Sequence, residues 1–426
     1  MFCQLEVLRH CFPPSVRRIL EELPDSLDET YERILREIRK SNQGLARRLM
    51  QCLVVAVRPL RVEELAEVLV FDFKAEGIPK LNENWRWEDQ EEAVMSACSS
   101  LVTIVNDEDS RIVQFSHFSV KEFLTADRLA EPMRAVSHYH IELEAAHTIV
   151  AQACLGVLLR LDNHVGRDNI GDFPLAPYAG EYWNRHAKFG SVSARIKDGM
   201  ECLFDEDKLH FAMWLWIYDK EAVNRIPTMR PEKPEAVPLY HAARLGFRDL
   251  AAHLIDNHPE HVNARNYWEE SAMHAAAVEG NTEIASLLLE HDADIESRNT
   301  FNSTPLHFAS VGGKLDVGQY LLDHGADING RDNCRRTPLF RAARRGHFEF
   351  AQMLLERGAK IDIRDRRGKT PLSRAVEMGM VEVARLLLKH GADVNARDNH
   401  GKTPSQYTTK QDILELLSEH GSGSVG

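Results

Sequence analysis

Apolar residues and turn residues return at one fixed spacing through the second half of the chain. A glycine follows eight residues after a proline, and the pair recurs every 33 residues, as Pro305 with Gly313, Pro338 with Gly346 and Pro371 with Gly379. Pro404 continues the series, and two less regular copies at 237–247 and 271–281 keep the offset, which gives six units. Leucine-rich segments such as LLLKHGADVNARD join them. A period of roughly 20 to 50 residues indicates a repeat architecture.

The residue pattern of each unit predicts a pair of helices. In one copy, the Thr370 hydroxyl caps a helix, and Pro371 suits its first position, where no backbone donor is needed. Ala375 is small because two helices approach closely there, and Gly379 allows the left-handed turn that ends the first helix. The leucines at 386–388 form the apolar stripe of a second helix. Because one pair cannot bury both of its faces, the units are expected to stack as an α-solenoid.

The repeated motif resembles a known family. T-P-L-H-x-A-A, followed by G-A-D-x-N at a 33-residue period, resembles the ankyrin repeat over about residues 238–420. The last unit departs from the pattern, because Leu416 and Leu417 come about three residues early and SQYTTKQD is polar, as in a terminal cap. The resemblance implies binding of a partner through the loop tips and the exposed face of each first helix.

The first half of the chain has a different pattern. The segment 23–40 carries a capping box, Ser26 with Glu29, ahead of an amphipathic helix. Three helices and a hairpin then form a winged-helix pattern, followed by one more helix. The expected order is helices at 45–57, 61–70 and 87–100, a β-hairpin formed by 101–105 and 111–117, and a helix at 119–130.

This half also carries a resemblance. Through LPDSLDETYERIL, LRVEELAEVL, FSHFSVKEFL and HFAMWLWIYD, residues 1–230 resemble the region that follows the nucleotide-binding core in fungal NACHT and ankyrin proteins. The winged-helix stretch is similar to the inositol-deacylase winged-helix family, a name that transfers no activity. In such proteins a P-loop NTPase core comes first, and we expect this chain to start after it. The expected division is a helical remnant of that junction at 1–42, a winged-helix domain at 43–131, a helical linker region at 132–230 and ankyrin repeats at 231–426, with a proline-rich lead-in at 226–238.

Composition narrows the classes of function. The 426 residues carry a formal charge of −13, which argues against nucleic-acid binding, because affinity for phosphate backbones comes from clustered Lys and Arg. No apolar run approaches the roughly 18 residues that a membrane crossing requires, so no membrane association is expected. The seven cysteines are scattered without a C-x-x-C pair, which is typical of reduced thiols. We therefore expect a cytoplasmic protein, with the nucleus as the alternative compartment.

Several motifs suggest chemistry, but a structural interpretation is favoured for each. The triplet GKT at 368–370 resembles the end of a phosphate-binding loop, yet the glycine required five residues upstream is Ile363. GSGSVG at 421–426 lacks a strand before it and a helix after it. His140, Glu144 and His147 have a spacing that metal ligands can use, and His117 and Ser119 lie close together in the sequence. A structural interpretation is favoured for both sets as well. We expect no enzyme, no cofactor and no metal site.

DNA binding by the winged helix is a lesser alternative. It is opposed by the acidic wing tip 107–109 and by four acidic residues on the helix before the wing, Glu88, Asp89, Glu91 and Glu92.

The binding surface is expected at the loop tips and first helices of the repeats. One part of the repeats is basic although the chain as a whole is acidic. Residues 331–374 hold thirteen Lys or Arg and five Asp or Glu, a net charge of +8, so the remaining residues carry a net charge of −21. A protein partner with an acidic surface or peptide fits this charge, and the alternative is that the arginines are solvated or pair with the acidic first half. The expected contact residues are Tyr267, Trp268, Glu270, Phe301, Ser303, Asn333, Arg336, Arg344, Arg345, Arg366, Arg367, Lys369, Glu377 and Met378.

The sequence therefore predicts a mainly α-helical, non-catalytic scaffold or sensor: an ankyrin-repeat α-solenoid preceded by a winged-helix domain and a helical linker region. The alternative is the regulatory and sensor part of a NACHT-type, NTP-driven signalling switch whose catalytic core is upstream or in another chain. The identity of the partner and the oligomeric state are not readable from the residues.

Overall fold

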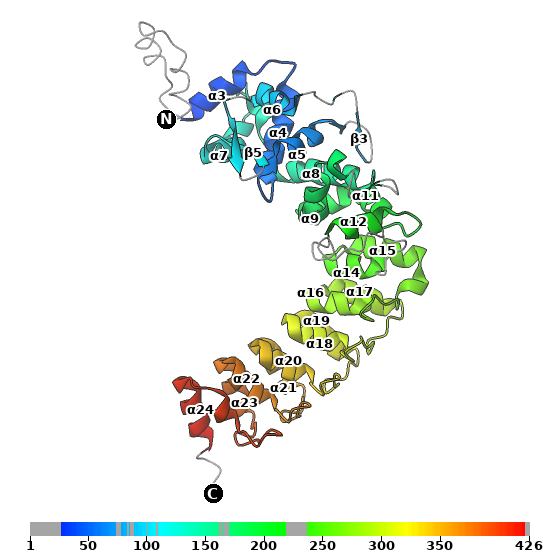
Figure 1. The fold of residues 1–426 in the computed structure, drawn as a ribbon, viewed down its shortest axis with the longest axis vertical. Coiled ribbons are helices and arrows are strands. Elements are labelled where there is room, and N and C mark those ends of the chain that lie inside the picture. The colour runs from blue at the N-terminus through cyan, green and yellow to red at the C-terminus, as the bar shows by residue number, and fades with distance from the viewer. Residues whose placement is uncertain are drawn as a thin grey trace. The chain divides into compact units, whose positions relative to one another are not determined.

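The computed structural model describes residues 27–73, 78–82, 85, 89–98, 100–107, 110–161, 165, 170–218 and 237–421. The chain divides into two compact units, Met1–Lys233 and Pro234–Gly426, and each is described by itself (Figure 1). Among the helices so described, none has the length and apolar character that a membrane crossing requires. Several predictions lie outside the described residues: the cap at Ser26, Glu88 on the helix before the wing, most of the wing tip, the lead-in up to 236 and the tail from 422.

The first unit begins with the predicted winged-helix arrangement. A three-stranded antiparallel sheet has the order β1-β5-β4, in which Val113 of β5 pairs with Leu60 on one side and Ile104 on the other. The predicted helices and hairpin are present, except that the helix expected at 119–130 ends at Thr125 and a separate 3₁₀ helix covers 127–130; β1 and the two-stranded sheet of β2 and β3 were not predicted. The elements are α3 Leu27–Glu37, α4 Gln43–Val55, β1 Leu60–Arg61, α5 Val62–Leu69, β2 Phe71–Asp72, β3 Lys80–Leu81, α6 Gln90–Cys98, β4 Val102–Asp107, β5 Ser110–Phe115 and α7 Phe118–Thr125.

Polar contacts fix the start of α7 and the start of α5. His117 caps α7, because its Nδ1 accepts a hydrogen bond from the backbone N–H of Ser119 at 3.3 Å. The Ser119 hydroxyl also lies 2.7 Å from the hydroxyl of the buried Tyr31, so His117 and Ser119 have structural roles. At α5 the buried Glu64 accepts hydrogen bonds from Arg58 at 2.6 Å and from the backbone N–H of Arg61 at 2.8 Å.

The helices that follow pack around aromatic side chains. Trp183 meets Trp214 edge to face at 5.8 Å between ring centroids, and the Trp214 indole donates to the carbonyl of Gly180 at 3.0 Å. His140 lies outside α8, which carries Glu144 and His147, so these three residues do not share one helical face. The elements are η2 Asp127–Ala130, η3 Ser137–Tyr139, α8 Leu143–Leu158, η4 Ile170–Asp172, α9 Ala176–Ala187, α10 Val192–Arg195, α11 Lys197–Leu203 and α12 His210–Tyr218.

The second unit is a row of stacked helix pairs, which Figure 1 shows in series from α14 to α24. The small residues predicted at the helix contacts are fully buried, among them Ala309, Ala342 and Ala375. The bounds are α14 Pro238–Leu245, α15 Arg248–Asn257, η5 Pro259–His261, α16 Ala272–Glu279, α17 Thr282–Glu290, α18 Pro305–Gly312, α19 Leu315–Asp323, α20 Pro338–Arg345, α21 Phe348–Glu356, α22 Pro371–Met378, α23 Val381–Lys389, η6 Pro404–Tyr407 and α24 Gln411–Gly421.

The ends of the first helices follow the predicted chemistry. The hydroxyl of Thr370 accepts a hydrogen bond from the backbone N–H of Ser373 at 3.2 Å and so caps α22. Gly379 ends that helix at φ +74, in the left-handed region that glycine adopts without cost. In the last unit the 3₁₀ helix η6 replaces the first helix, as its polar sequence predicted for a cap. Leu416 and Leu417 of α24 are buried.

Candidate protein-binding surface

One side chain builds each loop tip of the array. The Oδ1 atom of Asp332 accepts hydrogen bonds from two backbone N–H groups of its own loop, those of Cys334 at 2.8 Å and Arg336 at 2.9 Å. The same pair of bonds occurs in every loop from the second unit onward, because an Asn or Asp recurs every 33 residues. This anchor was not predicted, although the recurring residue marks it in the sequence: Asn266, Asn299, Asp332, Asp365 and Asp398.

Neighbouring tips are joined by backbone hydrogen bonds. The N–H of Asn333 donates to the carbonyl of Phe301 at 2.9 Å, and the N–H of Arg366 donates to the carbonyl of Cys334 at 2.8 Å. The Asn333 side chain adds a bond to the carbonyl of Thr300 at 3.0 Å. The tips therefore form a continuous edge in which the position of each loop depends on its neighbour.

Arginines form a second line of bonds along the loops, which we call the arginine ladder: Arg265, Arg298, Arg331, Arg364 and Arg397. Each of the first four donates from its guanidinium to the backbone carbonyl of the next ladder arginine, over 2.5 to 3.3 Å. The last one, Arg397, donates to the carbonyl of Gly401 in its own loop at 3.0 Å. These bonds hold the guanidinium groups in place without neutralising their charge.

Three aromatic side chains are exposed together at the first two tips. Tyr267, Trp268 and Phe301 are 69%, 51% and 55% exposed. The ring centroids of Trp268 and Phe301 are 6.1 Å apart with nearly parallel planes, and Tyr267 meets Trp268 edge to face at 5.1 Å. Exposed aromatic residues that keep a fixed geometry are typical anchors of protein interfaces.

Five arginines gather around the end of α20, and we call them the arginine cluster: Arg336, Arg341, Arg344, Arg345 and Arg374. Partial burial and then the charges of Arg374, Arg336, Arg345 and Arg341 hold the pKa of Arg344 below its usual value. Such mutual repulsion indicates positive charge that the protein itself leaves partly uncompensated.

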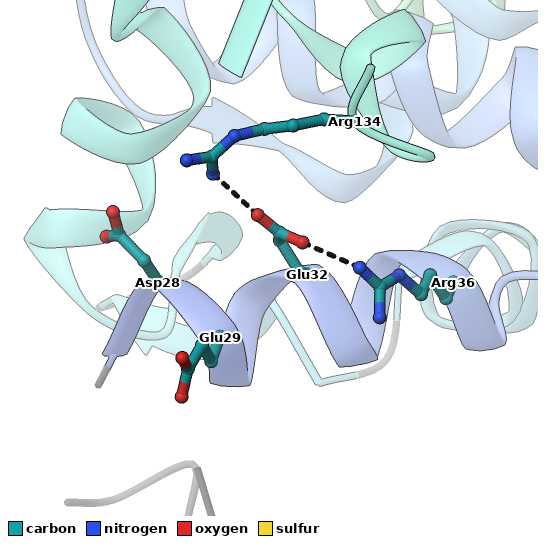
Figure 2. A pocket seen from close by; sticks show the side chains of 5 residues that line it. All are labelled: Asp28, Glu29, Glu32, Arg36 and Arg134. Carbon is teal, nitrogen blue, oxygen red and sulfur yellow. Dashed lines mark hydrogen bonds and ion pairs between the residues drawn. The ribbon is translucent and has the colours of Figure 1, made fainter. Parts of the chain in front are cut away.

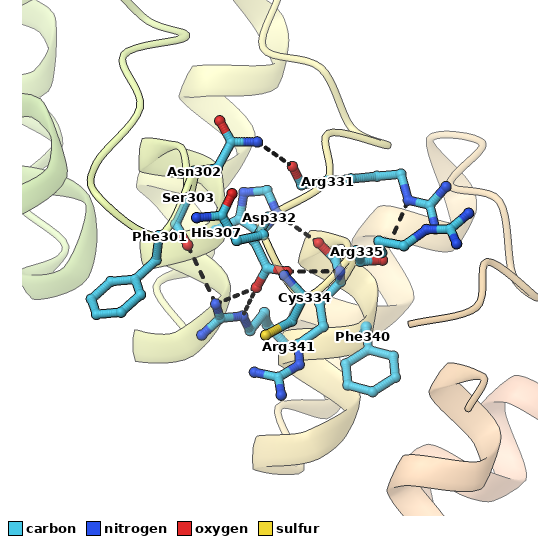
Figure 3. A network of polar contacts seen from close by, with 12 residues as sticks. Phe301, Asn302, Ser303, His307, Arg331, Asp332, Cys334, Arg335, Phe340 and Arg341 are labelled. Atoms are coloured by element: carbon cyan, nitrogen blue, oxygen red, sulfur yellow. Dashed lines mark hydrogen bonds and ion pairs between the residues drawn. The ribbon is translucent and has the colours of Figure 1, made fainter. Parts of the chain in front are cut away.

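Two acidic side chains offset part of the cluster. Asp332 pairs with Arg341, whose guanidinium also reaches the hydroxyl of Ser303 at 3.3 Å, as Figure 3 shows. Glu377 pairs with Arg374 at 2.7 Å. Among the ion pairs of the described residues, none involves Arg336, Arg344 or Arg345. Three guanidinium groups of the cluster thus form no ion pair with the described residues.

The remaining predicted contact residues differ in exposure. Arg345, Arg366, Arg367, Asn333 and Met378 are exposed, whereas Arg336, Arg344, Glu270 and Glu377 are half-buried. Glu270 accepts a hydrogen bond from the hydroxyl of Tyr240 at 2.8 Å, which ties this carboxylate to the neighbouring helix α14.

Two predicted contact residues are buried, so the expectation that they face outward is wrong. Ser303 is 3% exposed, and its backbone N–H is bound to the side chain of Asn299 at 2.9 Å. Lys369 is 6% exposed, because its ammonium lies over the ring of Tyr407 in the next unit and also pairs with Glu377. Neither side chain is exposed in the way that a contact position requires.

A pocket of about 530 Å³ lies in the first unit, on α3 and the segment before α8 (Figure 2). It was not predicted. Figure 2 shows Glu32 between Arg36 and Arg134, at 2.8 Å and 2.6 Å, and Asp28 pairs with Arg128 at 2.7 Å. Because its charged groups largely satisfy one another, this pocket offers a ligand less than the arginine cluster does.

Both units of the chain match known protein families. The chain matches the family model of ankyrin repeats (three copies) over residues 219–299, 239–332, 295–365 and 329–398. It also matches the winged helix domain of GPI inositol-deacylase over residues 31–136. The chain therefore contains ankyrin repeats and a winged-helix domain of this kind, as the two resemblances predicted.

One curated relative is a fungal protein. The azaphilone pigments biosynthesis cluster protein L of Monascus ruber is 32% identical over 287 residues, which cover 62% of this chain and 59% of that protein. This chain thus spans less than two thirds of the length of the relative. The match is consistent with the predicted similarity to fungal NACHT and ankyrin proteins.

Proposed function

We propose that this chain, with its ankyrin repeats and its winged-helix domain, is a non-catalytic scaffold or sensor that binds an acidic peptide or acidic protein surface. The ankyrin repeats support a role in protein interaction. The proposed surface is the arginine cluster together with the aromatic tip residues Tyr267, Trp268 and Phe301.

The uncompensated charge around Arg344 is the observation that carries this proposal. Burial and the charges of four neighbouring arginines lower the pKa of Arg344, and only Asp332 and Glu377 pair with members of the cluster among the described residues. Bringing a carboxylate to Arg344 and Arg345 relieves that repulsion. A guanidinium binds a carboxylate through two parallel hydrogen bonds, so Arg also favours a defined orientation of the partner.

The aromatic tips suit the apolar part of the same partner. Arginine and aromatic side chains are the residue types that dominate the binding energy of protein interfaces, whereas the acidic groups of the partner govern the association rate. Binding is therefore expected to weaken with salt because part of the attraction is between exposed charges.

The test is binding of the full chain to a short labelled peptide in which Glu alternates with Leu, measured by fluorescence anisotropy. The double change Arg344→Glu and Arg345→Glu is expected to weaken binding about 100-fold, since like charges then face each other. Arg385→Glu is the matched control, because Arg385 is an exposed arginine on the second helix of its unit. Equal affinity of wild type and double variant contradicts the proposal.

The regulatory and sensor part of an NTP-driven signalling switch is the second candidate function. The order of a winged-helix domain before ankyrin repeats favours it, as in the fungal NACHT proteins that the sequence resembles. A Walker-type loop upstream on the same transcript supports this candidate. ATP or GTP turnover by the 426-residue chain alone contradicts the non-catalytic scaffold.

DNA binding by the winged helix is disfavoured by charge. Glu91 of α6 pairs with Arg111 of β5, so an arginine next to the wing is already neutralised. Glu92 and Asp89 lie beside it and repel phosphates.

A further inference from the structure

Four arginines line one pocket between the loops of the ankyrin array. The pocket measures about 370 Å³, a size at the lower end of small-ligand sites, and is lined by Arg331, Arg335, Ile363, Arg364, Asp365, Arg366, Gly368 and Asn399. It differs from the arginine cluster, with which it shares no residue. Figure 3 shows the guanidinium groups of Arg331 in the loop and Arg341 on α20 on opposite sides of the view, with Arg341 next to Ser303.

The charge of this pocket is not balanced from within. Its one acidic lining residue, Asp365, is buried and accepts hydrogen bonds at Oδ1 from the backbone N–H groups of Arg367 and Lys369. Of the ion pairs among the described residues, none includes any of the four lining arginines. Asp362 interacts electrostatically with Arg364, but its carboxylate accepts a hydrogen bond from the backbone N–H of Asp393.

Two of the four arginines are fixed before any ligand arrives. Arg331 and Arg364 belong to the arginine ladder and donate to the carbonyls of Arg364 and Arg397, at 2.7 Å and 2.5 Å. A guanidinium has five donors, so each keeps donors for a ligand after these bonds. A site whose donors are already in place loses less conformational freedom when an anion binds.

The backbone of the third arginine has a conformation that glycine adopts more easily than other residues do. Arg335 has φ +62, in the left-handed region, and the equivalent positions of the next two loops are Gly368 at φ +80 and Gly401 at φ +76. The backbone N–H of Arg335 donates to the carbonyl of Asp332 at 2.7 Å, so the turn fixes this conformation. The equivalent positions of the two preceding loops, Glu269 and Asn302, have φ +59 and +57, so the left-handed turn is a feature of the loop itself and holds the backbone of Arg335 at the pocket.

We propose that this pocket binds a phosphate group, with Arg331, Arg335, Arg364 and Arg366 as its donors. A dianion with several acceptor oxygens matches several guanidinium groups better than a single carboxylate does. The group is supplied either by a free phosphorylated small molecule or by a phosphorylated side chain of a protein. The site does not depend on the proposed peptide surface.

The experiment is calorimetric titration of the full chain with inorganic phosphate, pyrophosphate and a phosphoserine peptide beside its unphosphorylated form, all at one ionic strength. Saturable phosphate binding is expected. Arg335→Gly and Arg366→Gln are each expected to weaken it about tenfold, the usual effect of removing one charge-assisted contact. Tighter binding of the phosphopeptide than of pyrophosphate identifies a protein side chain as the source, and the reverse order identifies a small molecule.

Arg335→Gly separates binding from folding. Glycine removes the strain at φ +62, so the melting temperature is expected to stay the same or rise while phosphate affinity falls. Arg345→Gln in the arginine cluster is the matched control and is expected to bind phosphate as the wild type does. The proposal is overturned if Arg335→Gly and Arg366→Gln bind phosphate like the wild type, if Arg345→Gln loses as much affinity, or if chloride at equal ionic strength has the same effect. Loss of peptide binding in Arg344→Glu with Arg345→Glu leaves this result unchanged, so the two proposals fail separately.

Discussion

The ammonium nitrogen of Lys369 lies 2.9 Å from a carboxylate oxygen of Glu377 at the start of one repeat. The same nitrogen is 3.7 Å from the centroid of the Tyr407 ring in the last unit, so Lys369 joins two units. Burial opposes ionisation of Glu377, but Lys369 and Arg374 outweigh it and hold the pKa of this carboxyl below its usual value.

Lys369→Met is therefore expected to destabilise the array. The loss is about 1 to 2 kcal/mol, because Glu377 is partly exposed and keeps Arg374 as a partner. The measurement is chemical denaturation of the full chain. Arg367→Met, two residues away and exposed, is the control and should change the free energy of unfolding by less than about 0.5 kcal/mol. Equal losses in the two variants contradict a structural role for Lys369.

His307 makes the stability of the array depend on pH. Its Nδ1 accepts from the backbone N–H of Thr304 at 3.2 Å, and its Nε2 lies 3.0 Å from the carbonyl of Arg336 in the next loop, so the neutral ring fits. Burial lowers the pKa of His307 to about 4. The unfolded chain takes up this proton below about pH 6.5, and the folded chain resists it until about pH 4. Stability is thus lost as the pH falls through this window.

His307→Gln is the variant that tests this. Glutamine can accept and donate in the same places, as Gln406 does when it bonds the backbone N–H of Thr403 at 3.0 Å in the last unit. The wild type is expected to lose about 2 kcal/mol more than His307→Gln between pH 7 and pH 5 in urea denaturation curves. Parallel pH profiles for the two proteins contradict the assignment, because other titrating groups are common to both.

Gly368, part of the GKT triplet, is expected to be needed for a close backbone contact. At φ +80 an added Cβ would lie 2.7 Å from the backbone nitrogen of Asn399. Gly391 has φ +84 but no heavy atom within 4 Å of such a Cβ, so it serves as the control. Gly391→Ala is expected to cost about 1 kcal/mol and Gly368→Ala about 3 kcal/mol. Thermal melts that give equal losses would show that the contact with Asn399 is unimportant.

The regular part of the fold was predictable because its signals are local. Thr370, Pro371 and Gly379 each act within one helix turn, and their 33-residue recurrence repeats the same signal. The two-residue strand β1 was not predictable, because its pairing with β5 joins Leu60 to Val113 across more than 50 residues. The fourfold division of the chain into domains remains a prediction.

The surface was predictable only in part. Position in the repeat correctly indicated exposure for Tyr267, Trp268 and Phe301. It failed for Lys369, because the burial depends on Tyr407, a residue of the irregular last unit that the repeat pattern does not describe. The role of these residues in binding stays a prediction.

The arginine ladder has a consequence for how such an array changes in length. Each ladder bond joins an arginine to the carbonyl of an identical residue 33 positions later, and Arg397 bonds within its own loop. Units are therefore interchangeable at their joints. Duplication or loss of one whole unit leaves every remaining ladder arginine with an acceptor, whereas an insertion of any other length breaks the series at one joint. The ladder is therefore compatible with arrays of different numbers of units, provided that each unit keeps its length of 33 residues.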